Sequence, residues 1–264
     1  MSVKQRLARW ALIAAAATLA LLVGLPLAGL ASTLSWDELR AGLGQPMALQ
    51  ALRLTLLTTS LSLAVTVSLG TPLAWLAATR RSRWVRVAET IVQLPAVIPP
   101  AVAGIALLLA FGRHGVLGRW LAAGGLSLPF TTAAVVLAEV FVSCTYYVQA
   151  ATAAFAQVDR THVQVARTLR ATPWQAFAKV TLPLALPGLL AGAAMAWSRA
   201  LGEFGATLLF AGNLPGRTQT LPLAMYAALE TDVRAAQALA LMLVAIACVT
   251  LLTARRLARR AAWR

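Results

Sequence analysis

Residues 131–154, TTAAVVLAEVFVSCTYYVQAATAA, carry one charged side chain, Glu139, in 24 positions. A helix rises about 1.5 Å per residue, so about 20 apolar residues cross the roughly 30 Å hydrocarbon core of a bilayer. Over the whole chain, 60% of the 264 residues are hydrophobic and 12% are charged, against about 25% charged residues in soluble domains. The sequence therefore predicts an all-α integral membrane protein.

Similar apolar blocks lie on both sides of this one. We predict six transmembrane helices, over residues 10–31, 52–79, 88–111, 131–154, 184–210 and 235–253. The first block follows the basic residues Lys4, Arg6 and Arg9. A cleavable signal peptide has the same order, a basic start and then an apolar core. It is longer than the about 7–15 apolar residues of such a core, so we expect a retained anchor.

Lysine and arginine are shared unequally between the two sides of this topology. Sixteen lie on the side of the termini and six on the other, with Arg199 inside the fifth span. The sixteen are Lys4, Arg6, Arg9, Arg80, Arg81, Arg83, Arg86, Arg160, Arg167, Arg170, Lys179, Arg255, Arg256, Arg259, Arg260 and Arg264. Because positive loops stay in the cytoplasm during insertion, both termini are predicted to be cytoplasmic. Residues 1–51 then form the anchor helix and first periplasmic loop, residues 52–253 the transmembrane core, and residues 254–264 a basic cytoplasmic tail.

Composition and motifs argue against several other classes of protein. The net charge of +15 does not indicate nucleic-acid binding, because the arginines lie between apolar blocks and form no single basic face. Cys144 and Cys248 lie within apolar blocks and have no CxxC partner, so neither a disulfide framework nor a metal site is expected. The chain has no GxxxxGK[ST] phosphate loop. We therefore expect a non-catalytic subunit whose ATP coupling, if any, comes from a partner.

The fourth loop, residues 159–183, is predicted to form two short helices. Thr172 is placed to cap the second helix, Pro173 suits its first position, and Gln175 completes a capping box. One interpretation is an amphipathic helix at the membrane surface, with Trp174 among the lipid headgroups. The other is a docking surface for a partner protein.

Three segments carry a resemblance to a known family. ARTL at 166–169, with PW at 173–174 and TLPL at 181–184, resembles the EAA loop of binding-protein-dependent ABC transporter permeases. RALGEFGAT at 199–207 and GNLPGRTQTLP at 212–222 are similar to molybdate permeases and more distant from sulfate permeases. The resemblance implies a type I (MetI-like) bundle in the bacterial inner membrane that imports molybdate as a homodimer. It also implies a cytoplasmic ABC ATPase dimer, which binds the ATP and Mg, and a periplasmic molybdate-binding protein; this chain itself is expected to bind no cofactor.

In that family the fourth loop is the coupling helix that docks on the ATPase. The resemblance assigns this role to Gln164, Ala166, Arg167, Leu169, Arg170, Pro173 and Trp174. The family's Glu-Ala-Ala falls on residues 164–166, and its glycine falls on Arg170. Glycine permits a left-handed turn there, which costs another residue about 1–2 kcal/mol. Either the turn is built differently, or Arg170 gains a contact that offsets the strain.

Arg199 and Glu203 stand four residues apart in the fifth span, on one predicted helical face. Charges at membrane depth cost about 2.5–3.5 kcal/mol each, so the two are expected to pair. The pair either locks helix packing only, or places Arg199 on the path of a dianion with Glu203 holding it. The resemblance adds further candidates for the translocation path or its gate, namely Thr207, Asn213, Arg217 and Thr218; the loop that carries the last three is either a gate or a plain connection.

Small and polar residues are expected to organise the bundle. Gly188 and Gly192 form a GxxxG pair that permits close helix approach. Prolines 95, 99 and 100 interrupt the third span. Glu139 either pairs with a neighbouring span or is protonated. The hydroxyls of residues 55–66 in the second span either satisfy one another between helices or line the pore.

The sequence leaves open which anion is carried and allows two other classes of membrane protein to be compared. The cargo could be tungstate, sulfate or thiosulfate, since all are tetrahedral dianions. An ion-driven secondary transporter is disfavoured, because it predicts inverted repeats or a chain of acids in the spans, and only Glu139 and Glu203 qualify. A membrane scaffold protein is also disfavoured, because that class does not explain the two short helices predicted in the fourth loop.

Overall fold

A computed structural model describes the backbone of residues 3–80 and 82–262, and side chains except those of residues 3, 4, 6–8, 254, 255 and 257–262. Arg81 and Arg264, and the side chains of Lys4, Arg6, Arg255, Arg259 and Arg260, therefore lie outside the described part of the predicted basic flanks. Every regular element in the described part is a helix, and this confirms the all-α prediction. The elements are α1 (Val3–Ser32), α2 (Trp36–Leu43), α3 (Pro46–Thr79), α4 (Arg83–Gln93), η1 (Leu94–Ala96), α5 (Pro100–Phe111), α6 (Gly118–Ala123), α7 (Thr132–Ala156), α8 (Arg160–Thr168), α9 (Pro173–Ala176), the π-helical turn η2 (Phe177–Thr181), α10 (Leu182–Leu201), α11 (Gly205–Ala211), α12 (Leu221–Leu229) and α13 (Val233–Ala262).

Within the described residues, five stretches of helix are long and apolar enough to cross a bilayer. They are Arg9–Ser32, Pro46–Thr79, Thr132–Ala156, Pro173–Leu201 and Val233–Thr253. They correspond to the first, second, fourth, fifth and sixth predicted spans. Six long helices were predicted, and the described residues contain five. The difference lies in the third predicted span.

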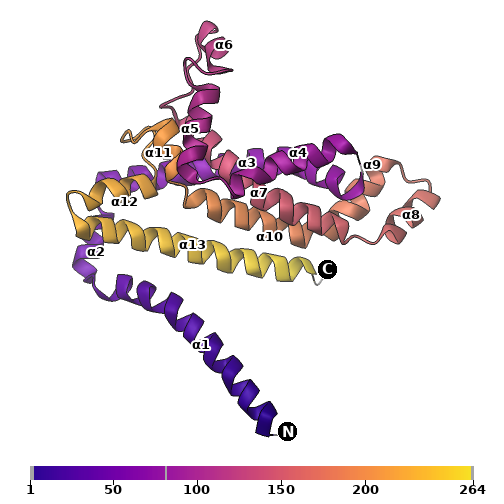
Figure 1. Cartoon of the computed structure of the whole chain (residues 1–264), viewed down its shortest axis with the longest axis horizontal. Coiled ribbons are helices and arrows are strands. Elements are labelled where there is room, and N and C mark those ends of the chain that lie inside the picture. Colours follow the sequence, from indigo (N-terminus) through magenta and orange to yellow (C-terminus); the bar gives the residue numbers. More distant parts are fainter. Residues whose placement is uncertain (1–2, 81, 263–264) are drawn as a thin grey trace.

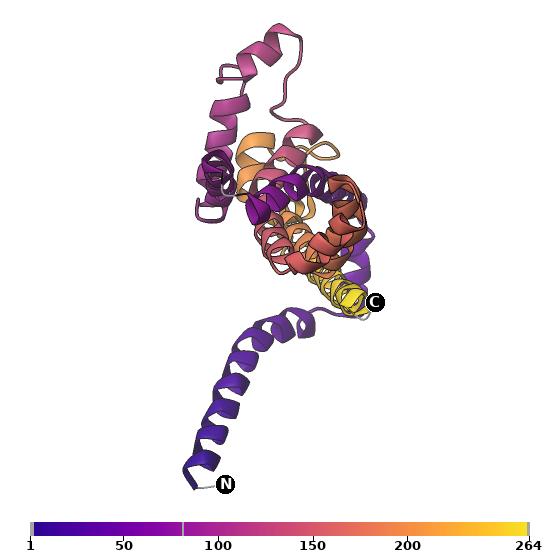
Figure 2. The same cartoon turned by 90° about the vertical axis from the view of Figure 1, so that its right-hand side faces the viewer.

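The predicted third span, residues 88–111, is divided between α4 and α5. α4 ends at Gln93, the 3-10 turn η1 contains Pro95, and α5 starts afresh at Pro100. Proline lacks a backbone N–H and disfavours helical geometry in the residue before it, and Pro99 adopts φ −55° and ψ 140°. α5 has 12 residues, about 18 Å of helix, and leaves the bundle toward α6 (Figures 1 and 2).

The fifth predicted span, residues 184–210, also differs from one continuous helix. α10 starts at Leu182, directly after η2, and ends at Leu201 with Gly202 as its C-terminal cap. α11 resumes at Gly205 and is 7 residues long. The two charged residues predicted on one helical face are thus separated by the end of α10.

The bundle is built on α3, α7 and α10. Its core includes Ala74 of α3, Tyr147 and Ala151 of α7, and Leu189 of α10. An ideal Cβ added to Gly188 lies 2.5 Å from the Ala154 Cβ, and one added to Gly192 lies 2.8 Å from the Ala150 Cβ. No side chain fits at either glycine without movement, so the predicted GxxxG approach is confirmed between α10 and α7.

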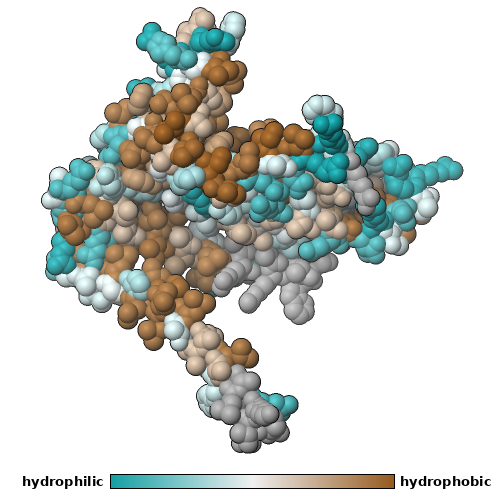
Figure 3. Space-filling view, in the orientation of Figure 1, coloured by the Kyte–Doolittle hydropathy of each residue, from teal (hydrophilic) through white to brown (hydrophobic). Residues whose placement is uncertain are grey.

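The two ends of the bundle carry different elements. Figure 1 shows α8 and α9 at one end, together with the end of α13, and α2, α11 and α12 at the other. α1 runs away from the bundle, and its end is joined to α13 by a hydrogen bond of 3.0 Å from Gln237 Nε2 to the Leu30 carbonyl. Hydrophilic residues gather at both ends, with apolar surface between them and along α5 (Figure 3). This banding fits a protein that crosses a bilayer.

Candidate functional site

The fourth loop folds into a helical hairpin of α8 and α9 that projects from one end of the bundle. Asp159 caps α8 by accepting a 2.8 Å hydrogen bond from the Thr161 backbone N–H. This bond holds the pKa of the Asp159 carboxyl below its usual value. Thr172 and Gln175 form the predicted capping box, with bonds of 3.2 Å from Gln175 N to Thr172 Oγ1 and 2.9 Å from Thr172 N to Gln175 Oε1. The first predicted helix and the start of the second are confirmed, but the second is not a separate short helix, because α9 continues through Phe177–Thr181 into the helix that begins at Leu182.

Arg170 takes the left-handed conformation that the family's glycine permits, with φ 65°. The Ala171 N–H bonds to the Ala166 carbonyl at 3.0 Å, and the Arg170 N–H bonds to the Arg167 carbonyl at 3.1 Å. These two bonds are the pair that defines a Schellman motif at a helix C-terminus. The turn therefore has the left-handed geometry that a glycine favours. Among the residues that the structure describes, the exposed Arg170 side chain has no hydrogen-bond or ion-pair partner.

All seven predicted coupling residues lie in this hairpin. Ala166 is half-buried and the other six are exposed, with Leu169 at 77% and Trp174 at 72% of their full accessible area. Large apolar side chains exposed beside arginines are typical of surfaces that a partner covers. The structure thus brings these residues together on one protruding surface, which we call the hairpin tip: Gln164, Ala166, Arg167, Leu169, Arg170, Pro173 and Trp174.

The hairpin is joined rigidly to α10. Phe177 packs on Trp174 with ring centroids 5.6 Å apart and on Trp75 of α3 at 5.1 Å. It begins the π-helical turn η2, which runs into α10 without a break. Such turns recur at functional sites. The hairpin tip is therefore connected to α10 by an unbroken stretch of helix.

At the far end of α10, Arg199 and Glu203 form the predicted pair across the break before α11. Arg199 Nη2 lies 2.8 Å from Glu203 Oε2, in an ion pair that is not aligned as a hydrogen bond. Glu203 Oε1 accepts a 2.8 Å hydrogen bond from the Ala206 N–H in the first turn of α11. The arginine side chain is 26% exposed and the glutamate side chain 1%. Glu203 therefore connects two helices, and the exposed partner is the cation.

The other predicted path residues fall on α11 and the loop behind it. Thr207 is fully buried, and its hydroxyl has no hydrogen-bond partner among the described residues. Asn213 is half-buried, and Arg217 is exposed with its carbonyl accepting a 2.9 Å bond from Thr132 Oγ1. Thr218 closes the loop by accepting from Leu214 N at 2.9 Å and donating to the Gly212 carbonyl at 3.2 Å. Its hydroxyl is thus used within the loop.

The hydroxyls of α3 and the Glu139 carboxylate meet inside the bundle. Thr58 Oγ1 donates to Glu139 Oε1 at 2.8 Å, so the Glu139 carboxyl group contacts a neighbouring span, as one of the two interpretations expected. Thr55 Oγ1 accepts a 2.8 Å bond from the Leu221 N–H at the start of α12. Ser62 and Thr66 have buried hydroxyls that find no hydrogen-bond partner in the described part of the chain. Thr55 and Thr58 therefore connect α3 to other helices through their hydroxyls, and the hydroxyls of Ser62 and Thr66 do not.

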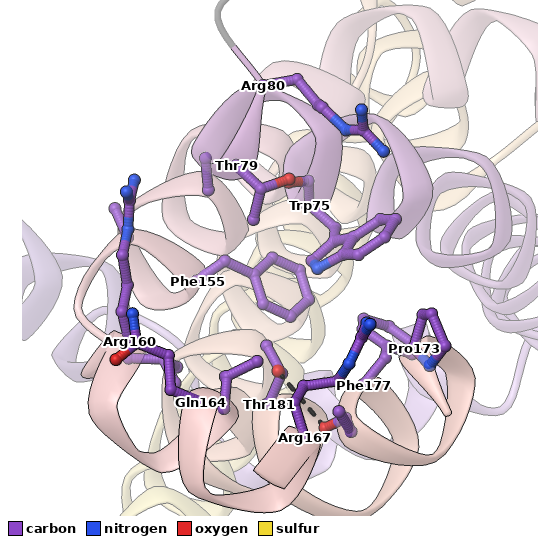
Figure 4. A pocket seen from close by; sticks show the side chains of 15 residues that line it. Trp75, Thr79, Arg80, Phe155, Arg160, Gln164, Arg167, Pro173, Phe177 and Thr181 are labelled. Atoms are coloured by element: carbon purple, nitrogen blue, oxygen red, sulfur yellow. Dashed lines mark hydrogen bonds between the residues drawn. The ribbon is translucent and has the colours of Figure 1, made fainter. Parts of the chain in front are cut away.

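A cavity of about 620 Å³ lies under the hairpin, and sequence reasoning did not find it. Trp75, Arg80 and Phe155 line it together with hairpin residues (Figure 4). Its walls come from segments about 80 and 20 residues apart in sequence, and no local pattern joins them. The one available signal is the recurrence of aromatic residues near the ends of α3, α7 and α9.

Comparison with known sequences identifies the family. The family described as binding-protein-dependent transport system inner membrane component matches residues 70–263. The molybdenum transport system permease protein ModB of Mycobacterium tuberculosis (strain ATCC 25618 / H37Rv) is 44% identical over 246 residues, which is 93% of each chain. The protein of the same name from Escherichia coli (strain K12) is 38% identical over 216 residues, which is 80% of this chain and 93% of the relative.

Solved structures show the same fold. A bacterial ABC transporter involved in the import of the acidic polysaccharide alginate has a chain that matches with a TM-score of 0.77 at 18% identity, covering 98% of this chain and 97% of that one. The MetNI methionine ABC transporter, in an inward-facing conformation, matches with a TM-score of 0.65 at 19% identity, covering 81% and 95%. The predicted MetI-like bundle is confirmed by these likenesses and by the family match. The chain belongs to the binding-protein-dependent transport system inner membrane components, the multi-pass permeases of ABC transporters.

Proposed function

We propose that this chain is the permease subunit of an ATP-driven importer that moves molybdate across the bacterial inner membrane. The observation that carries the proposal is 44% identity, over 93% of both chains, to a protein named as a molybdenum transport system permease. The RALGEFGAT and GNLPGRTQTLP segments, on which the resemblance to molybdate permeases rests, form the α10–α11 break and the loop after α11.

The proposed assembly contains two copies of this chain, two copies of a cytoplasmic ABC ATPase and a periplasmic molybdate-binding protein. One related solved structure is an alginate ABC transporter in complex with a periplasmic protein that holds an alginate pentasaccharide. ATP and Mg bind to the ATPase, and this chain binds no cofactor. The hairpin tip faces the cytoplasm with both termini, in agreement with the sixteen basic residues on that side.

The hairpin tip is the ATPase-docking surface in this proposal. Leu169 and Trp174 insert into the partner, and Arg167 and Arg170 pair with its acidic groups. Closure of the ATPase dimer on ATP displaces α9 and η2. Because η2 continues into α10, that displacement reaches the Arg199–Glu203 pair at the other end of the helix. The hairpin and α10 thus form the two-state element that couples nucleotide to gate.

Arg199 supplies the positive potential that a dianion needs at membrane depth. Its guanidinium is partly exposed, while Glu203 is buried and holds it in place. One guanidinium attracts an oxyanion without enclosing it, and this suits a transporter that must release its cargo. Thr207, Asn213 and Arg217 border the same end of the path, and the loop of residues 212–222 meets the binding protein.

The experiment that tests the proposal is reconstitution of the chain with its ATPase and binding protein in liposomes. We expect molybdate-loaded binding protein to stimulate ATP hydrolysis and sulfate to stimulate it far less. Equal stimulation by sulfate, with no preference in the binding protein, contradicts the molybdate assignment. Absence of stimulation by every tetrahedral dianion contradicts the proposed function as a whole.

A further inference from the structure

The cavity beneath the hairpin lies where several spans end. Its walls include Thr79 and Arg80 at the end of α3, Phe155 and Ala156 at the end of α7, and Phe177 just before α10. Spans of one bundle that end together mark the boundary between hydrocarbon and headgroups. The volume of about 620 Å³ falls within the range of about 300–1,000 Å³ that is usual for sites of organic ligands.

Aromatic rings form the interior of this cavity. The Phe177 ring lies 5.1 Å from the Trp75 ring and 6.2 Å from the Phe155 ring, measured between centroids. Figure 4 shows these rings between the hairpin and the ends of α3 and α7. Such a surface binds hydrocarbon and offers few hydrogen bonds.

Three arginines, Arg80, Arg160 and Arg167, surround this aromatic interior. Among the side chains that the structure describes, the ion pairs are Arg199 with Glu203 and Arg234 with Glu38, so none of the three guanidinium groups has a carboxylate partner. Figure 4 shows Arg80 on the α3 wall and the other two on the hairpin wall. Arginine at such a site recognises phosphate, because its planar fork matches two phosphate oxygens.

We propose that this cavity binds an anionic phospholipid, with its negatively charged headgroup beside Arg80 and Arg160 and the adjoining part of an acyl chain against the aromatic rings. Basic pockets between spans on the cytoplasmic side are a known mode of headgroup recognition. A free oxyanion fits less well, because the interior is apolar and far larger than five atoms require. Docking of ATPase carboxylates fits less well too, because Arg80 belongs to the α3 wall and the exposed apolar residues Leu169 and Trp174 lie on the hairpin tip.

The test is retention of lipid by the full chain in neutral detergent, measured by native mass spectrometry after addition of phosphatidylglycerol or phosphatidylcholine. The wild type is expected to retain phosphatidylglycerol in preference to phosphatidylcholine. Each juxtamembrane charge contributes about fivefold to the binding of an anionic lipid, so R80Q/R160Q should lower phosphatidylglycerol retention by at least about tenfold. Arg167 is left intact because it also belongs to the hairpin tip.

Matched variants give the comparison. R83Q/R86Q removes two exposed charges of α4 that do not line the cavity, and it is expected to retain lipid as the wild type does. R80K/R160K keeps the charge and is expected to retain an intermediate amount, which also shows that the pocket has folded. Equal loss in the two glutamine variants, or no loss in either, overturns the proposal.

Two further measurements distinguish the lipid from the other possible occupants of the cavity, a free oxyanion and the ATPase. Displacement of the lipid by inorganic phosphate or molybdate at millimolar concentration makes the cavity an oxyanion site and overturns the proposal. Loss of ATPase co-purification in R80Q/R160Q, with lipid unchanged, makes it a protein-docking site and overturns it as well. The lipid measurement uses neither ATP nor cargo. A negative result there leaves the proposed transport function unaffected, and a negative result in the transport assay leaves the lipid proposal unaffected.

Discussion

The Glu203 carboxylate lies 2.8 Å from the Arg199 guanidinium, across the break between α10 and α11. The same carboxylate accepts a hydrogen bond from the Ala206 N–H, so it fixes the end of one helix to the start of the next. We therefore propose a structural role for Glu203 and an electrostatic role for Arg199. The first two variants below separate these roles.

Glu203→Ala should destabilise the chain, because it leaves the Arg199 cation and the Ala206 N–H without their partner. Breaking a fully buried pair costs about 3–5 kcal/mol, and we expect less than that here because solvent reaches Arg199. The measurement is the thermal midpoint in detergent. A midpoint equal to that of the wild type contradicts a structural role for Glu203.

The double variant R199Q/E203Q removes both charges and keeps a similar shape. A pair that only locks helix packing is nearly dispensable when both charges are replaced together. We therefore expect the double variant to recover most of the thermal midpoint lost in Glu203→Ala and still to lose molybdate uptake. Uptake at the wild-type rate in this variant shows that Arg199 has no role in the path.

Replacement of Arg167 and Leu169 by Asp should abolish co-purification of the ATPase and leave membrane insertion intact. Both side chains are exposed on the hairpin tip, and the change reverses a charge and removes an apolar contact. The matched control is R83D/W84D, which makes the same kinds of change at two exposed residues of α4. Retention of the ATPase by the first variant, or its loss in both, refutes the docking assignment.

Arg170→Gly should stabilise the hairpin by about 1 kcal/mol, because φ 65° strains an arginine and suits a glycine. Hydrogen exchange of the α8 amides measures the local effect. The control is Arg167→Gly, within α8, which should weaken protection by a similar amount. Equal loss of protection in the two variants contradicts the left-handed turn.

Thr58→Val should destabilise the bundle by about 1–3 kcal/mol, because the buried Glu139 Oε1 loses its donor. Thr59 is an equally buried neighbour whose hydroxyl bonds only to carbonyls of its own helix. Thr59→Val is therefore expected to cost much less. Similar thermal midpoints for the two variants mean that the contact between α3 and α7 contributes little.

The sequence predicted features that local patterns encode. The apolar blocks gave the long helices, Thr172 and Gln175 gave the capping box, and Gly188 and Gly192 gave the contact of α10 with α7. Each of these depends on residues within a few positions or on one helix face. The left-handed position at Arg170 was indicated by the glycine that the family has there, and Arg170 adopts it with φ 65°.

Features that depend on distant contacts were not predictable in the same way. The prolines marked an interruption near residue 95, but hydropathy alone gave one span over residues 88–111 where the structure has α4 and a separate α5. The break after Leu201 was missed because the block of residues 184–210 is apolar enough to be taken as one span, although Gly202 and Gly205 stand on either side of the break. The cavity joins the ends of α3 and α7 to the hairpin, and no periodicity brings Trp75 and Phe155 together.

The most direct test of the coupling from the hairpin to the gate is molybdate uptake into liposomes that hold this chain with its ATPase and the molybdate-loaded binding protein. Uptake is expected to require ATP and to stop when Arg167 and Leu169 are changed to Asp. Molybdate movement through the purified chain alone, with neither nucleotide nor companion protein, would contradict it.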